Sequence, residues 1–197
     1  MQYVIRPAMK SDASAMYSIS IRDHAQSYYQ RLIPANFLQY FHNRYHMSDI
    51  RRCEFIKKTA ETIDDPNWFL FVAEANGRVL GYTMAYVENE HTVQLKGLFV
   101  DPRWHKQGIG SSLFKASLGV ASSDMVTRLL VVSENDIAKK LYEKYGFKPI
   151  GQSDKLFFGA KQDIMEKSVT DWQYSNKMLL YLVYGTTKSA WKYHKSI

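Results

Sequence analysis

The clearest hydrophobic pattern lies in the middle of the chain, from residue 93 to residue 147. Val93 to Val100 is largely apolar with β-branched ends, which predicts a strand that Asp101-Pro102 ends. A basic loop with two glycines follows it. Apolar residues then recur at helical spacing, at Ile109, Leu113, Ala116 and Val120. The pattern therefore predicts a strand, a glycine loop and a helix in direct succession.

A second strand and helix complete the same stretch. Arg128 to Val132 is a predicted strand, and Ser133-Glu134-Asn135 separates it from the helix. The apolar face of that helix consists of Ile137, Ala138, Leu141, Tyr142 and Tyr145. Gly146 in the C′ position, with Pro149 shortly after it, predicts where the helix ends.

The first sixty residues predict a short strand and then helices. Tyr3 to Arg6 is a strand candidate that Pro7 ends, and Ser11 or Asp12 can cap a helix that runs to about Asp23. The pattern from residue 24 to residue 63 is helical, with an interruption at Pro34. This region is rich in aromatic residues, which indicate helix packing or an acceptor pocket.

A β-hairpin leads into the central stretch. Trp68 to Ala75 and Val79 to Val87 flank Asn76-Gly77, which is the strongest short-range hairpin signal, and residues 88–91 form the next turn. We therefore expect three antiparallel strands before the glycine loop.

After Phe147 the pattern is weaker. We expect a strand through Ile150, and then a long polar loop from Ser153 to Asn176. Residues 177–184 have the pattern of a buried strand, and the basic tail, residues 185–197, is expected to be flexible.

The glycine loop has the chemistry of a phosphate site. Glycines let the backbone come close to a ligand, and the free N–H groups and dipole of a helix N-terminus favour an anion. A Walker loop would need a lysine after Gly110, where the chain has Ser111 and Ser112. A dinucleotide fingerprint would need glycine at Leu113. Both of these nucleotide-binding motifs are therefore excluded.

Composition limits the remaining possibilities. The length of 197 residues predicts one domain, residues 1–197. The single cysteine, Cys53, excludes an intrachain disulfide, and no cysteine–histidine spacing suggests zinc or another metal. The N-terminus has no apolar signal core and no apolar run reaches membrane-spanning length, so we expect a cytoplasmic protein with no membrane partner.

The net charge of +7 suits a multiply phosphorylated cofactor as well as nucleic acid. The basic residues are scattered and form no arginine-rich tract. We therefore expect no nucleic-acid partner, and a salt-dependent shift assay would test this.

Taken together, these motifs resemble the GNAT superfamily of acyl-CoA-dependent N-acyltransferases. The family's Arg/Gln-x-x-Gly-x-Gly/Ala loop corresponds to His105–Gly110, with histidine in the first position. Its asparagine after the next strand corresponds to Asn135, and its Leu-Tyr-x-x-x-Gly-Phe run corresponds to Leu141–Phe147. The resemblance implies an α/β (α+β type) fold. A mixed, mostly antiparallel sheet would be flanked by helices and splayed at the cofactor cleft, with residues 93–147 as the cofactor core.

The resemblance also implies acetyl-CoA as cofactor and direct transfer of the acetyl group to an amine in a ternary complex. The implied cofactor residues lie on the first strand, in the loop and around the second helix: Leu98, Phe99, Val100, His105, Lys106, Gln107, Gly108, Ile109, Gly110, Ser111, Asn135, Lys139 and Tyr142. Tyr142 matches the family's acid, which protonates the departing thiolate. Packing in the core is the alternative for Tyr142, as helix capping is for Asn135.

The base does not follow from the resemblance. Many relatives have glutamate where this chain has Gln94, and an amide cannot accept the proton. Glu88 near the start of the strand could act through water, as could Glu90 or His91. We assign Glu88 to catalysis, and Tyr28, Tyr29 and Gln94 to acceptor binding.

The expected acceptor is a small molecule with a primary amine: an amine, an amino acid or an amino-bearing antibiotic. A polyamine or a protein amine is the alternative, and a non-catalytic acyl-CoA-binding regulatory module is another. We expect a monomer or homodimer. The segment from Ser153 to Asn176 should cover the acceptor end or a second subunit, anchored by Trp172 and by Phe157 or Phe158.

Overall fold

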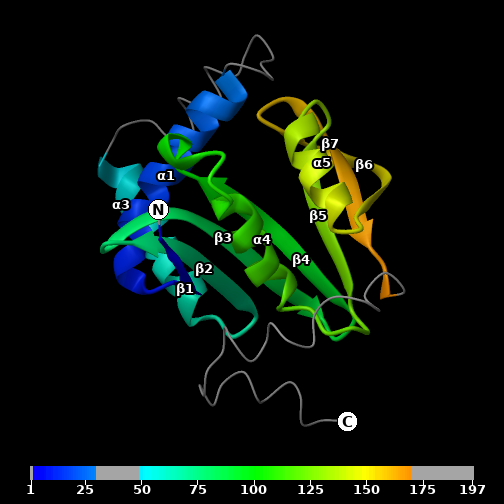
Figure 1. Ribbon diagram of the computed structural model, residues 1–197, viewed down its shortest axis with the longest axis horizontal. Helices are drawn as coiled ribbons and strands as arrows, with labels where there is room; N and C mark the ends of the chain where they lie inside the picture. The colour runs from blue at the N-terminus through cyan, green and yellow to red at the C-terminus, as the bar shows by residue number, and fades with distance from the viewer. Residues whose placement is uncertain (1, 30–48, 170–197) are drawn as a thin grey trace.

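One mixed sheet runs through residues 2–29 and 49–169, the part of the chain that the computed structural model describes (Figure 1). The elements are β1 (Val4–Pro7), η1 (Lys10–Asp12), α1 (Ala13–Tyr29), α3 (Asp49–Asp64), β2 (Trp68–Ala75), β3 (Arg78–Asn89), β4 (Thr92–Val100), η2 (Pro102–Trp104), α4 (Ile109–Leu118), β5 (Val126–Val132), α5 (Asp136–Lys144), β6 (Lys148–Phe157) and β7 (Ala160–Lys167). The sheet order is β1-β2-β3-β4-β5-β7-β6. β4 and β5 are parallel and all other neighbours are antiparallel. This confirms the expected α/β fold.

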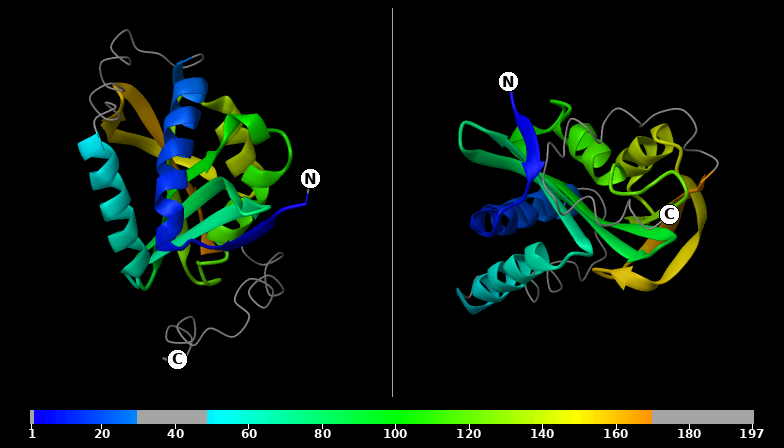
Figure 2. Two further views of the ribbon diagram at one scale, coloured as in Figure 1. Left: turned by 90° about the vertical axis from the view of Figure 1, so that its left-hand side faces the viewer. Right: turned by 90° about the horizontal axis from the view of Figure 1, so that it is seen from below.

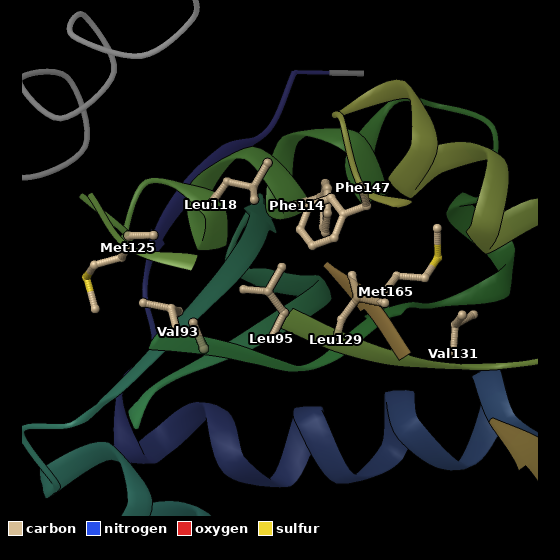
Figure 3. Close-up of a cluster of buried hydrophobic side chains, with 11 residues drawn as sticks. Val93, Leu95, Phe114, Leu118, Met125, Leu129, Val131, Phe147 and Met165 are labelled. Atoms are coloured by element: carbon tan, nitrogen blue, oxygen red, sulfur yellow. The ribbon is translucent and has the colours of Figure 1, made fainter. Parts of the chain in front are cut away.

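Helices cover both faces of the sheet. α1 and α3 lie on one face, and α4 and α5 lie on the other (Figure 2). On the second face, Phe114 and Leu118 of α4 pack with Val93 and Leu95 of β4 and with Phe147, all of them buried (Figure 3). The alternation of β4 produces this arrangement, because Gln94 between the two apolar residues faces the other side.

Local chemistry explains the elements that the sequence predicted well. In the β2–β3 hairpin, Asn76 and Gly77 both have positive φ, +50° and +72°, as a type I′ turn requires. Gly146 ends α5 with φ of +88°, which confirms its C′ position. β4 and α4 also begin and end within one or two residues of their predicted bounds.

The expected loop from Ser153 to Asn176 is wrong for residues 153–167. β6 extends to Phe157, and β7 returns antiparallel from Ala160 after a two-residue turn. The polar residues of this hairpin concealed it. β6 is an edge strand with mostly exposed side chains, so it lacks the apolar alternation by which a half-buried strand is recognised. The strand predicted at 177–184, the anchor Trp172 and the tail 185–197 lie outside the described residues.

The boundaries of other elements differ from the predicted ones by smaller amounts. α1 continues past Asp23 to Tyr29, and Pro7 belongs to β1, which it can do because β1 is an edge strand. Asp12 lies in η1, where its carboxylate accepts the Met9 N–H and pairs with Arg6. Among the described helices, none is long and apolar enough to cross a membrane.

Candidate active site

β4 and β5 pair only over their first residues, and the candidate site lies where they separate. Thr92–Leu95 lie opposite Val126–Leu129, after which β4 pairs only with β3 and β5 only with β7. Figure 1 shows the two strands diverging. The backbone of residues 97–100 therefore has no β5 residue opposite it. Its N–H and C=O groups on that side make no bond to β5 and, apart from the Val100 carbonyl, which accepts a hydrogen bond from His105, can bind other partners.

A bulge marks the point of separation. Leu95 is opposite Ala85 and Gly97 is opposite Met84, so Lys96 is an extra residue in β4. The hydroxyl of buried Thr83 donates a hydrogen bond to the Gly97 carbonyl at 2.8 Å, which fixes the backbone after the bulge. A Cβ on Gly97 would lie 2.6 Å from the ring of Phe99, so glycine is needed for that ring to lie along the strand.

The loop between β4 and α4 presents backbone amides. Lys106 and Gly108 have positive φ, and Gly108 is the N-cap of α4 without a side-chain cap. The N–H of Ser112 makes the first helical bond, to the Gly108 carbonyl. The N–H groups of Ile109, Gly110 and Ser111 consequently have no intrahelical partner. A Cβ on Gly110 would meet only the Val100 side chain, at 3.7 Å, so this helix end is open enough to hold an anion.

Tyr3 is a neighbour of this loop that sequence reasoning missed. Its hydroxyl lies 2.9 Å from the Ser112 hydroxyl and 3.6 Å from the position of a Cβ on Gly108. No local pattern could have found the contact, because Tyr3 and Ser112 are 109 residues apart.

A buried carboxylate fixes the start of the loop. Asp101 accepts hydrogen bonds from the backbone and guanidinium of Arg103, and from Arg22 of α1 at 2.9 Å. Burial by itself would raise the pKa of Asp101, but the hydrogen bonds of Arg103 and the two positive charges outweigh it and hold the pKa at about 2. Asp101 thus connects α1 to the end of β4.

Asp23, which follows Arg22 in α1, contacts the loop as well. His105 Nε2 donates to the Val100 carbonyl at 2.9 Å and lies 3.6 Å from Asp23 Oδ1. The contact with Asp23 raises the pKa of His105 above its ordinary value, although burial opposes the shift. The family's first loop position is thus used here to hold β4 and α1 together. Arg22 and Asp23 were not among the predicted site residues.

Tyr142 lies on the β5 side of the separation. Its ring packs against Phe114 with the centroids 5.1 Å apart, and against Phe147 at 6.2 Å. Burial raises the pKa of Tyr142 to about 12, and the negative charge of Asp23 adds to the shift. Tyr142 therefore keeps its proton at neutral pH, and its hydroxyl can donate that proton as well as accept a hydrogen bond.

Asn135 and Lys139 are occupied by contacts within the chain. Asn135 Oδ1 accepts the Ala138 N–H at 3.2 Å and caps α5, which leaves its amide NH₂ to donate elsewhere. Lys139 pairs with Asp163 at 2.5 Å and donates to the Ser133 carbonyl. Asn135 can combine capping with cofactor binding, whereas Lys139 would have to leave Asp163.

Gln94 and Glu88 meet at the paired end of β4, away from the loop. Gln94 Nε2 donates to Glu88 Oε2 at 3.0 Å, in an exposed contact. Thr92 to Leu95 belong to the segment where β4 still pairs with β5. The two residues therefore contact each other before the strands separate, and the sequence analysis did not predict this contact.

Four aromatic side chains gather at the other end. His24 of α1 lies 5.1 Å from Phe99, 5.6 Å from Phe157 and 5.5 Å from Phe158, measured between ring centroids. Phe99 belongs to β4, whereas Phe157 and Phe158 are at the tip of the β6–β7 hairpin. The contact joins the two diverging halves of the sheet. The side chains of Tyr28 and Tyr29 lie outside the described part of the structure.

Comparison with known proteins agrees with this geometry. The sequence profile of the Acetyltransferase (GNAT) family matches residues 21–147. The chain belongs to the GNAT family. The match covers β4, the glycine loop and α5, together with the turn of α1 that contacts the loop.

Relatives of this GNAT chain are distant. An uncharacterized N-acetyltransferase of Mycobacterium tuberculosis is 32% identical over 91 residues, which are 45% of this chain and 58% of the relative. A Schizosaccharomyces pombe protein is 30% identical over 80 residues, 40% of this chain and 53% of that protein. The chain thus matches little more than half the length of these curated relatives.

Solved structures share the fold. The PaiA N-acetyltransferase of Thermoplasma acidophilum, in complex with coenzyme A, has a TM-score of 0.68 at 17% identity and covers 85% of this chain and 99% of its own. The ribosomal-protein-S18-alanine N-acetyltransferase of Escherichia coli has a TM-score of 0.61 at 20% identity, and covers 90% of this chain and 99% of its own. At such identities the likeness establishes the fold alone.

Asp101→Asn should lower the free energy of unfolding by about 2 kcal/mol at pH 7. Because the folded-state pKa of Asp101 is lowered to about 2, its stabilisation is present above pH 4 and is lost as the pH falls toward 2. The difference between wild type and variant in urea unfolding should shrink over that range. Asp154→Asn, at an exposed carboxylate of β6, is the control and should change little. A constant difference between pH 5 and pH 2 would contradict the assignment.

Proposed function

We propose that the protein transfers the acetyl group of acetyl-CoA to a primary amine of a small molecule. The observation that carries this proposal is the uncapped, glycine-lined start of α4 beside the separation of β4 and β5. Family membership supports acyl transfer, and the coenzyme A found in the Thermoplasma acidophilum relative supports the cofactor.

The residues fit such a cofactor. The N–H groups of Ile109, Gly110 and Ser111 would hold the pyrophosphate, because Gly110 leaves their approach open. The backbone of Leu98 to Val100, which faces no β5 residue, would hold the arm and direct an N–H at the carbonyl oxygen. Asn135 would contribute its amide. When bound, acetyl-CoA supplies an acetyl group activated as a thioester.

Tyr142 is the proposed acid. Its hydroxyl is protonated at neutral pH, and that proton can pass to the departing sulfur. The buried aromatic packing on Phe114 orients the ring, so the packing and the acid role are compatible. A core tyrosine without such a role is the competing explanation.

Two carboxylates compete for the role of base. An alkylammonium group with a pKa of about 10.4 costs about 4–5 kcal/mol to deprotonate at pH 7, so a proton acceptor is needed. Glu88 can act through water, and its hydrogen bond with Gln94 orients the Gln94 amide. Asp23 is the alternative, because it contacts His105 and its charge reaches Tyr142. The base takes its proton from the amine nitrogen and Tyr142 gives its proton to the departing sulfur, and both atoms are bonded to the same carbon during transfer. The base should therefore lie near Tyr142, which favours Asp23.

Experiments can distinguish acetyl transfer to a small amine from the alternative functions that the sequence left open. A polyamine or a protein amine as acceptor would leave the cofactor site unchanged. A non-catalytic acyl-CoA-binding module would bind the cofactor without releasing its thiol. A thiol-release assay with acetyl-CoA and a panel of amines separates these functions. The same protein measured by size-exclusion chromatography would tell monomer from homodimer.

Gly110→Asp should abolish detectable acetyl-CoA binding in calorimetry, because a carboxylate would occupy the proposed anion site. The fold should survive, since a Cβ there makes only an ordinary contact with Val100. Gly108→Asp should also lose binding, but the φ of +81° adds backbone strain. Gly151→Asp, at an open glycine on β6, is the matched control and should bind normally. Unchanged affinity in Gly110→Asp would refute the phosphate assignment.

Tyr142→Phe should lower kcat by about 10²–10⁴-fold, the usual contribution of a general acid, and leave acetyl-CoA affinity nearly unchanged. The phenyl ring keeps the contact with Phe114, so stability should change little. Tyr145 also packs its ring against Phe114, so Tyr145→Phe is the control for removing a hydroxyl at this contact. If Tyr142→Phe is fully active, Tyr142 is a core residue.

The pH profile of kcat/KM should identify the base. Activity through a carboxylate base falls as the pH drops and the carboxylate becomes protonated, so removing the base removes this acidic limb. If Asp23 is the base, Asp23→Asn should lose the limb and about 10²-fold or more in rate, with Glu88→Gln unaffected. If water carries the proton to Glu88, Glu88→Gln should lose the limb at a cost of about tenfold. If both variants keep the limb, neither carboxylate is the base.

A further inference from the structure

Two hairpins of this chain use the same turn with different residues. The β2–β3 hairpin turns through Asn76-Gly77, with φ of +50° and +72°. The β6–β7 hairpin turns through Phe158-Gly159, with φ of +49° and +83°. Both are two-residue connections with positive φ at both positions. Asparagine suits the first position, whereas a bulky aromatic residue there is an outlier. Turn chemistry therefore does not account for Phe158.

The ring of Phe158 has contacts that asparagine could not make. It lies 4.5 Å from the Phe157 ring and 5.5 Å from His24, which in turn contacts Phe99. His24 is 3% exposed, whereas Phe99, Phe157 and Phe158 are half-buried. Strained backbone persists where the surroundings hold it, and it gathers at ligand sites.

The position of this cluster relates it to the reaction. Phe99 lies in the segment of β4 after the bulge, where the backbone faces no β5 residue. His24 follows Asp23, which contacts His105 and whose charge reaches Tyr142. The ring contacts thus connect the residue next to Asp23 with β4 and with the hairpin tip.

We propose that His24, Phe99, Phe157 and Phe158 form one wall of the acceptor site, and that the acceptor is a monoamine with an aromatic body, an arylalkylamine. This deepens the proposed function and rests on it. Partly exposed rings bind an aromatic body by stacking and edge contacts, and they also attract an ammonium group.

The charges around the wall argue against a polyamine. A chain with several ammonium groups needs several carboxylates to receive them. Glu88 lies at the paired end of β4, away from the rings, and the two acidic residues of β7 are paired: Asp163 with Lys139 and Glu166 with Arg128. Asp23, next to His24, contacts His105, and one ammonium group would share its carboxylate with that contact.

The test compares 2-phenylethylamine, propylamine and spermidine as acceptors. With wild-type protein, kcat/KM for 2-phenylethylamine should exceed that for each of the others by about tenfold or more, the discrimination that an apolar contact provides. Binding of 2-phenylethylamine by calorimetry gives a second readout that does not need turnover.

Phe158→Asn examines the wall directly. The variant should raise Tm by a few degrees, because asparagine suits the turn, while KM for 2-phenylethylamine rises about tenfold or more. Acetyl-CoA affinity should stay the same, and KM for propylamine, which has no aromatic ring to stack on the wall, should rise much less than KM for 2-phenylethylamine. Asn76→Phe is the reciprocal control, which should lower Tm without altering KM for any acceptor.

The outcomes separate this inference from the proposed function. If spermidine or propylamine is acetylated at least as well as 2-phenylethylamine, or if Phe158→Asn leaves its KM unchanged, the inference is wrong and acetyl transfer stands. If 2-phenylethylamine binds and Phe158→Asn weakens its binding, but no amine is acetylated, the site stands and the proposed function fails. Absence of both binding and transfer refutes both.

Discussion

Parallel strands that pair over only four positions, Thr92–Leu95 with Val126–Leu129, create the opening on which the candidate site depends. The extra residue Lys96 breaks the register of β4 with β3, and the Thr83 hydroxyl then fixes the Gly97 carbonyl. Backbone groups of a sheet interior normally pair with the next strand. Here the separation leaves those of residues 97–100 facing no strand on the β5 side, beside the open N-terminus of α4. An extended, polar cofactor arm is the kind of ligand that such a backbone can hold.

One turn of α1 stabilises this opening from the opposite face of the sheet. Arg22 pairs with buried Asp101, Asp23 contacts His105, and His24 packs on Phe99 and on the tip of the β6–β7 hairpin. Three consecutive residues thus contact the end of β4, the glycine loop and the far half of the sheet. A shift of α1 would move all three together, so the geometry of the loop and that of the proposed acceptor wall are coupled through this turn.

The hairpin tip illustrates how local strain and function are related in this fold. Left-handed backbone costs an ordinary residue about 1–2 kcal/mol, and the chain avoids that cost at Asn76-Gly77. Phe158 has the strained backbone, and its ring reaches from the β6–β7 turn to His24 of α1.

The sequence by itself determined the cofactor half of the protein. Periodicity located β4, α4, β5 and α5, while turn chemistry located the Asn76-Gly77 hairpin and the end of α5 at Gly146, because these signals lie within a few neighbouring residues. The motifs around His105–Gly110 and Leu141–Phe147 were sufficient to indicate the family. Only the tertiary structure decided that the charge of Asp23 acts on the pKa of Tyr142, that Tyr3 reaches Ser112, and that Phe157 and Phe158 meet His24. These contacts join residues that are a hundred positions or more apart in the sequence. The bulge in β4 and the divergence of β4 from β5 bring these residues together, and neither feature leaves a periodic pattern in the sequence.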